Sequence, residues 1–97
     1  MRTNQNVADL LQGKMTSKEI LDIIFDDLEN QLLDKREVTV NLEKVTFISV
    51  YFLERLERFV EKAKKLSVEI KIVNVNPNVY KVFQVGRVKV VLNNCCS

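Results

Sequence analysis

The sequence predicts a two-layer α/β fold in which a mixed, mostly parallel sheet carries its helices on one face. Three stretches of alternating apolar and polar residues, at 38–42, 68–73 and 87–92, predict strands. Between them the apolar residues adopt helical spacing, first over 50–66 and then over the short stretch 76–86. Strand–helix–strand connections of this kind make neighbouring strands parallel through right-handed crossovers.

Each predicted strand has one polar face, and this decides how the sheet is covered. The polar positions are Thr39 and Asn41, Glu69 and Lys71, and Arg87 and Lys89. Strands covered by helices on both faces are apolar almost throughout, so we expect helices on one face only. The other face needs cover from residues 1–15 or from a second copy of the chain. The N-terminal segment has apolar residues with no other assigned place in the core: Val7, Leu10 and Leu11.

Capping signals and apolar stripes predict the two long helices. The segment Thr16-Ser17-Lys18-Glu19 has the Ser/Thr-x-x-Glu pattern of a capping box, and it opens a helix expected at 17–34. The helix at 50–66 is the clearest in the chain because its apolar residues form one stripe. That stripe consists of Phe52, Leu53, Leu56, Phe59, Val60, Ala63 and Leu66.

Shorter signals predict the remaining segments. The third helix begins with Asn76 as its N-cap and Pro77 in its first turn, and Gly86 ends it. The first fifteen residues predict only a short strand or turn that ends near Gly13. The tail at 93–97 is expected to be flexible, and it contains both cysteines, Cys95 and Cys96.

The composition is that of one ordinary globular domain over 1–97, and it disfavours several classes of function. The chain has 15 basic and 13 acidic residues, and a net charge of +2 is too balanced to indicate nucleic acid or a membrane as partner. Histidine is absent, and with it the commonest general base and zinc ligand. We therefore expect no enzyme, no metal and no cofactor. Because neither a secretory signal nor a disulfide framework is visible, a cytoplasmic location is expected.

Two segments resemble the STAS domain, which occurs in sulfate transporters and anti-sigma factor antagonists. The first is 38–49, VTVNLEKVTFIS, followed by an amphipathic helix, and the second is 70–79, IKIVNVNPNV. The resemblance covers about 38–92, and the helix at 17–34 is similar to one in a STAS-like variant family of unassigned function. It implies a STAS-like module that works by protein–protein recognition.

The resemblance places the contact surface in the loop 44–49 and the start of the next helix. In the sigma-factor regulators this loop carries Asp-Ser-Ser-Gly, and a kinase partner phosphorylates a serine there and is then released. This chain has Ser49-Val50-Tyr51-Phe52 instead, so tyrosine stands in place of the phosphorylated serine and the usual switch is not expected. The implied partner is a protein such as a histidine-kinase-like ATPase or a regulator complex. The residues expected to bind it are Ser49, Val50, Tyr51 and Glu54.

Other interpretations of these residues stay open. Ser49 fits a plain N-cap, and a regulatory phosphate on Ser49 or Tyr51 is the functional alternative because a helix N-terminus favours anions. Tyr51 otherwise fits a surface or rim aromatic. The rival function is a small nucleic-acid-binding protein that uses the helix 50–66, although interleaved carboxylates would repel phosphate. The basic residues in question, otherwise expected on a solvated face, are Arg55, Arg58, Lys62 and Lys65.

Overall fold

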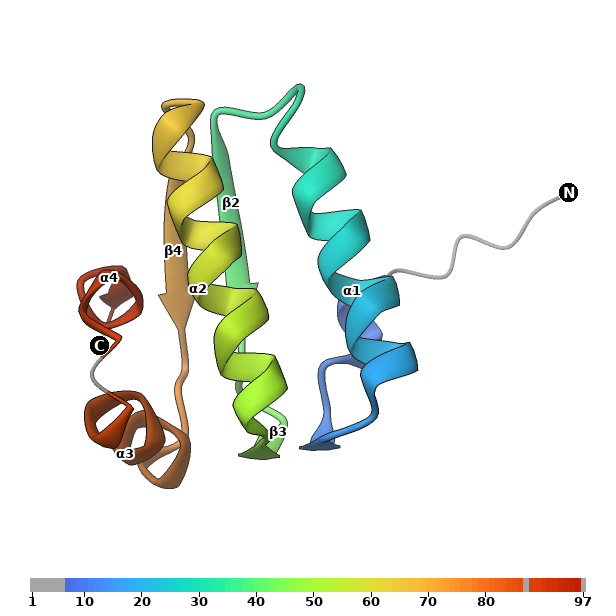
Figure 1. Cartoon of the computed structure of the whole chain (residues 1–97), viewed down its shortest axis with the longest axis vertical. Coiled ribbons are helices and arrows are strands. Elements are labelled where there is room, and N and C mark those ends of the chain that lie inside the picture. Colours follow the sequence, from blue (N-terminus) through green and yellow to red (C-terminus); the bar gives the residue numbers. More distant parts are fainter. Residues whose placement is uncertain (1–6, 87, 97) are drawn as a thin grey trace, which may run out of the picture.

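The helices of the main layer lie on one side of the strands, as the polar strand faces predict. The computed structural model describes residues 7–86 and 88–96. Figure 1 shows helix α2 (Val50–Lys65) in front of strands β2 (Glu37–Asn41) and β4 (Glu69–Val73). The predicted two-layer α/β class is therefore confirmed.

The N-terminal segment packs beside the helices and leaves the polar sheet face uncovered. Helix α1 (Lys18–Gln31) lies beside α2, and the 3-10 helix η1 (Val7–Leu10) packs against α1. Leu11 and Met15 enter the common core. The expectation that residues 1–15 cover the polar face is therefore wrong for the described part of that segment. The polar side chains that stay exposed on this face are Thr39, Asn41 and Glu69.

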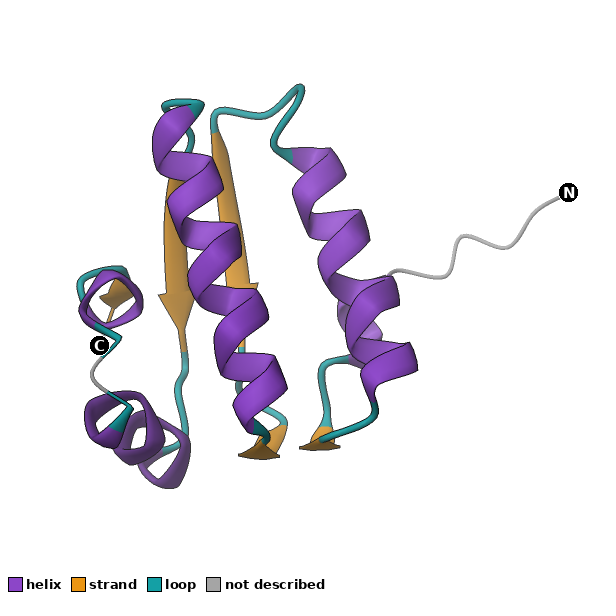
Figure 2. Cartoon of the chain, viewed as in Figure 1, coloured by secondary structure: helices purple, strands orange, loops and turns teal. Residues whose placement is uncertain are grey.

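Two small sheets are present, and each described strand pairing is parallel, whereas a mixed sheet was expected. Strand β1 (Gly13–Met15) pairs with β3 (Val45–Ile48), which occupies most of the segment 44–49 that was expected to be a loop. Strand β2 pairs with β4 in register along its whole length, and β5 (Cys95–Cys96) pairs with the end of β4. Figure 2 shows β2 and β4 in orange behind α2, and the short strands β1 and β3 at the lower end of the view.

The C-terminal end differs most from the prediction. The strand expected at 87–92 is wrong, because Lys89–Leu92 forms the short helix α4. Val88 and Val91 are both buried, a spacing of three that suits a helix, and a run this short does not separate the two periods. Of the two polar residues assigned to that strand, Lys89 begins α4, and Arg87 lies outside the described residues.

The tail expected to be flexible supplies the third strand of the larger sheet. The Ile72 amide donates to the Asn94 carbonyl over 2.9 Å, and Cys95 and Cys96 continue the pairing with β4. The tail takes this place because α4 returns the chain to the outer edge of β4, where backbone groups need partners.

Helix ends follow the predicted capping chemistry, with one shift. Helix α3 (Pro77–Val85) has Asn76 as its N-cap and Gly86 at its C-cap, as predicted. The N-cap of α1 is Ser17, which accepts from the Ile20 amide, so the predicted capping box starting at Thr16 is displaced by one residue.

The core between α1 and α2 is aromatic. Phe25 meets Phe52 edge to face at a centroid distance of 5.5 Å, and it meets Phe59 at 6.4 Å. The stripe of α2 is buried as expected, with Leu56 and Val60 in the same cluster. This core fixes the start of α2, where the predicted contact surface lies.

Candidate functional site

The turn between β3 and α2 is held by hydrogen bonds on both sides. The Ser49 amide donates to the Met15 carbonyl over 3.2 Å, which extends the pairing of β1 with β3. The Ser49 hydroxyl accepts from the Phe52 amide, also over 3.2 Å. Ser49 is thus the N-cap of α2, and the turn is fixed at both ends.

Two apolar side chains lie exposed beside this capped turn. Val50, the first residue of α2, is 72% exposed, and Phe47 near the end of β3 is 51% exposed. Glu54 lies one helical turn after Val50 and is also exposed. A fixed turn with exposed apolar side chains can bind a partner without a large ordering cost.

Tyr51 is tied to helix α1 and is not a free rim aromatic. Its hydroxyl donates to Asp22 Oδ1 over 2.5 Å. The Lys18 ammonium lies 4.8 Å from the centroid of its ring, within the range of a cation–π contact. The phenol is therefore fixed in orientation and its hydroxyl is already engaged.

Arg55 is buried beneath this surface, although the sequence placed it on a solvated face. Its side chain is only 6% exposed and bridges two carboxylates of α1. Nη1 lies 2.6 Å from Asp22 Oδ1, and Nη2 lies 3.1 Å from Asp26 Oδ1. The guanidinium also lies 5.5 Å from the centroid of the Phe25 ring. Arg55 and Tyr51 therefore share one acceptor atom on Asp22.

A charged seam continues from Arg55 along the two helices. Glu29 Oε2 lies 3.6 Å from Arg55 Nη2 and 3.8 Å from Arg58 Nε. Glu29 Oε1 lies 3.6 Å from Lys62 Nζ. Three basic side chains of α2 thus face a row of carboxylates on α1, which consists of Asp22, Asp26 and Glu29.

This arrangement alters the titration of Asp22. The hydrogen bond from the Tyr51 hydroxyl contributes most to lowering the pKa of the Asp22 carboxyl below its ordinary value of 3.8. Partial burial opposes that effect, and the positive charge of Arg55 lowers the pKa further. Asp22 is therefore ionised at neutral pH and acts only as an acceptor.

The comparison with known families agrees with this architecture. A family model described as STAS domain matches residues 12–94. The chain belongs to the STAS domain family. The match runs from the residue before β1 to the residue before β5, so it includes the turn, α2 and the charged seam. None of the curated proteins compared with the chain matches it. STAS domains are generally regulatory modules that bind other proteins.

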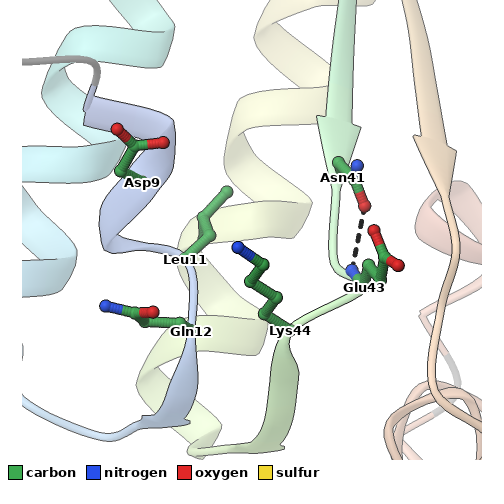
Figure 3. Close-up of a pocket in the computed structure, with 6 residues that line it drawn as sticks. All are labelled: Asp9, Leu11, Gln12, Asn41, Glu43 and Lys44. Atoms are coloured by element: carbon green, nitrogen blue, oxygen red, sulfur yellow. Dashed lines mark hydrogen bonds between the residues drawn. The ribbon is translucent and has the colours of Figure 1, made fainter.

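A polar hollow of about 320 Å³ lies on another side of this STAS domain. Figure 3 shows it between the N-terminal segment and the bend from β2 to β3, where the Glu43 amide donates to Asn41 Oδ1 over 2.9 Å. Lys44, the first residue of the loop 44–49 in which the contact surface was expected, lines it, whereas Ser49, Val50, Tyr51 and Glu54 do not. The residues that line it are Asp9, Leu11, Gln12, Asn41, Glu43 and Lys44.

The part of the STAS domain that the structure describes contains no group of three or more acidic or cysteine side chains placed to hold a metal ion. None of its helices combines the length and apolar character that crossing a membrane requires.

The structure brings the predicted contact residues to one place and adds others that the sequence did not reveal. Ser49, Val50, Tyr51 and Glu54 all lie at the start of α2. Asp22 was missed altogether, and Arg55 was considered only as an exposed cation for nucleic acid. The available signal was spacing, since acidic residues at 22, 26 and 29 and basic residues at 55, 58 and 62 each form a stripe on one helix face.

Proposed function

We propose that this STAS domain is a non-catalytic regulatory module that binds a protein partner in the cytoplasm. Contact is made through the turn before α2, and no phosphoserine switch operates there. By the family's pattern, the partner is a histidine-kinase-like ATPase or a component of a regulator complex. The residues proposed to meet it are Ser49, Val50, Tyr51 and Glu54.

The observation that carries this proposal is the exposed Val50 on a fixed turn. Val50 is 72% exposed between Ser49, whose hydroxyl caps the helix, and Tyr51, whose hydroxyl is bound to Asp22. Its neighbours hold the backbone in place, so little conformational entropy is lost when a partner covers it.

Binding of nucleic acid by α2 finds less support. Three of its four candidate cations, Arg55, Arg58 and Lys62, face carboxylates of α1 within 4 Å. A phosphate backbone would have to compete with these carboxylates, and its binding depends on free positive charge. The geometry therefore favours a protein partner.

A second copy of the chain is also a weaker candidate than another protein. The uncovered face of β2 and β4 presents exposed polar side chains such as Thr39 and Glu69. Lys71 on that face forms an ion pair with Glu37 over 2.9 Å. Stable self-association usually needs a more apolar surface.

The proposal is tested by affinity capture from the native host, with the wild-type chain and two variants compared by mass spectrometry. Val50→Asp is expected to lose a captured protein, because it puts a charge in the centre of the contact. Leu33→Asp is the matched control, since Leu33 is 75% exposed and lies just after α1, away from the turn. Equal capture by Val50→Asp and the wild type would contradict the proposal.

A further inference from the structure

Strand β2 forms one edge of the larger sheet and has a strand on one side only. Within the described residues the strand order is β2, β4, β5, so β2 pairs only with β4. The Leu42 amide donates to the Val73 carbonyl over 3.0 Å, and the Glu69 amide donates to the Arg36 carbonyl over 2.9 Å. Along a parallel pair, the residues of one strand that bond to the other alternate with residues whose backbone groups point away. The residues of β2 whose backbone groups point away from β4 are Glu37, Thr39 and Asn41.

This outer edge lacks the usual features that prevent further strands from pairing. Proteins commonly protect an edge strand with proline, with lysine or by keeping the strand very short. The five residues of β2 include neither proline nor lysine. Its one charged side chain, Glu37, forms an ion pair with Lys71 of β4 over 2.9 Å, on the side that is already paired. By contrast, β5 at the opposite edge of the sheet has only two residues.

The position beside this edge is vacant because the chain before β1 turns away from it. Strand β1 runs parallel to β3 and pairs with it from Gly13 onward, whereas residues 7–10 form η1 and do not lengthen that strand. Figure 3 shows the N-terminal segment on the side of β2 opposite to β4. The hollow of about 320 Å³ separates that segment from the end of β2. It therefore lies where a strand next to β2 would run.

We propose that the outer edge of β2 binds an extended segment of another protein, which joins the sheet as an additional strand. A second backbone offers alternating N–H and C=O groups at the spacing of Glu37, Thr39 and Asn41. Because side chains alternate along a strand, those of the segment face the buried Leu11 on one side and the exposed Thr39 and Asn41 on the other. The segment is accordingly apolar at every second residue, and it has no proline where its amides face β2.

A second copy of the chain fits this edge less well than a flexible segment. Helix α1 lies beside α2, on the side of β2 that faces away from β4 (Figure 1). Symmetric pairing of two β2 strands would bring both α1 helices over the joined edge, where they would compete for the same space. An extended segment brings no helix with it and needs only about 4.8 Å beside β2, the usual distance between strands.

The direct test is amide hydrogen exchange of the full chain, followed by NMR with and without a synthetic peptide. The peptide alternates valine and threonine and has a lysine at each end for solubility. In the free chain, the outward amides of Thr39 and Asn41 should exchange quickly, whereas those of Val38 and Val40 are bound to β4 and should exchange slowly. The peptide is expected to slow exchange at Thr39 and Asn41 at least about tenfold. Absence of binding, or binding that leaves these two amides unprotected, would overturn the inference.

The free chain provides a further check on the occupant. Slow exchange at Thr39 and Asn41 without peptide would overturn the inference, because the edge would already be covered. Protection that rises with protein concentration would identify a second copy as the occupant, and protection that does not would identify the chain itself.

Two N-methylated versions of the peptide test whether backbone groups form the contact. Methyl groups on alternate residues block all the amides on one side of the strand and leave those on the other side free. One version is expected to bind as the parent peptide does, and the other at least about tenfold more weakly, since it loses several hydrogen bonds. The two versions have the same charge and side chains, so equal binding by both would overturn the inference.

A proline in β2 tests the same contact from the side of the chain. Thr39→Pro removes the central outward amide, and an edge strand tolerates proline where the lost N–H is not bonded to its neighbour. It is expected to weaken binding of the peptide about tenfold. Lys18→Pro is the matched control, because Lys18 is the first residue of α1, where proline is tolerated, and does not belong to this edge. Equal binding by the two variants would overturn the inference.

This contact is separate from the turn before α2 and does not depend on the proposed function. Val50→Asp is expected to bind the peptide as the wild type does, because Val50 lies outside the edge. Loss of a captured protein with Val50→Asp therefore bears on the proposed function, whereas loss of peptide binding with Thr39→Pro bears on the edge. Loss of peptide binding with Val50→Asp would overturn the inference, because the peptide would then bind at the turn.

Discussion

Arg55 and Asp22 are 33 positions apart in the chain, yet Arg55 Nη1 lies 2.6 Å from Asp22 Oδ1. Tyr51 donates to the same oxygen from one turn earlier on α2. The contact therefore joins α1 to the helix start at which we place the partner. It also places the buried positive charge of Arg55 under that surface, and carboxylates of α1 compensate this charge.

Removal of Arg55 is expected to destabilise the protein more than removal of a neighbouring cation. Arg55→Met keeps much of the packed stem but removes the charged hydrogen bonds to Asp22 and Asp26. The loss should be about 1.5–3 kcal/mol, the range for hydrogen bonds to charged groups. The measurement is the free energy of unfolding from urea titration.

Arg58→Met is the matched control for this change. Arg58 lies on the same helix, is 64% exposed and approaches Glu29 only to 3.8 Å. An exposed pair of this kind contributes at most about 1 kcal/mol. Equal losses for the two variants would show that Arg55 does not bridge the helices as described.

The lowered pKa of Asp22 predicts the direction of acid destabilisation. Below the ordinary value of 3.8 the unfolded chain protonates this carboxyl first, and the folded chain protonates it only at lower pH. The stabilisation is therefore complete above the ordinary value and is lost as pH falls through the folded pKa. Tyr51→Phe removes the largest cause of the lowered pKa, so its acid unfolding should begin at higher pH than in the wild type.

Thermal melts recorded across the acid range check this prediction. Tyr80→Phe is the control, because Tyr80 is exposed on α3 and its hydroxyl forms no hydrogen bond within the described residues. Tyr51→Phe should have a lower melting temperature than Tyr80→Phe. Equal melting temperatures for the two variants would show that the Tyr51 hydroxyl does not stabilise ionised Asp22.

Phe59 is expected to be among the most sensitive core positions. It is fully buried and meets the Phe25 ring at a centroid distance of 6.4 Å. Phe59→Ala should cost about 3–5 kcal/mol, a severe loss for a domain whose total stability is of the order of 5–15 kcal/mol. Phe47→Ala removes the same side chain from an exposed site and should change the melting temperature little. Calorimetry of both variants decides whether the stripe of α2 is core.

The long elements could be predicted because many residues in each support the same secondary structure. The apolar stripe of α2 and the alternation of β2 repeat their period several times, and the Asn76-Pro77 start of α3 is a strong local signal. The end of the chain could not be predicted in this way. A run of five residues around Val90 fits both periods, and β5 exists only because β4 supplies its hydrogen bonds.

The candidate site likewise contains residues that a local pattern predicts and residues whose place depends on the rest of the fold. Ser49 could be assigned as a cap because capping is local and needs only the following three residues. Arg55 was misplaced because its burial depends on α1, whose orientation the sequence does not specify. From α2 alone, Arg55 lies among charged residues and looks solvated; its partners Asp22 and Asp26 come from another part of the chain.

The last prediction is that neither hydroxyl of the turn is phosphorylated as part of a switch. The Ser49 hydroxyl accepts from the Phe52 amide, and the Ser49 backbone is bound to Met15. The Tyr51 hydroxyl is engaged by Asp22 over 2.5 Å. A kinase would have to open the start of α2 to reach either one, and a phosphate on Tyr51 would face an ionised carboxylate.

Phosphosite mapping of the protein from its native host is therefore expected to show both residues unmodified. Phosphatase treatment of that protein should leave partner binding unchanged. Ser67 serves as an internal reference, since it lies exposed in the turn after α2 and should be labelled more readily by an added serine kinase. Stoichiometric phosphate on Ser49 or Tyr51, accompanied by release of the partner, would contradict the prediction. It would mean that the turn opens in the cell despite the bonds that hold it.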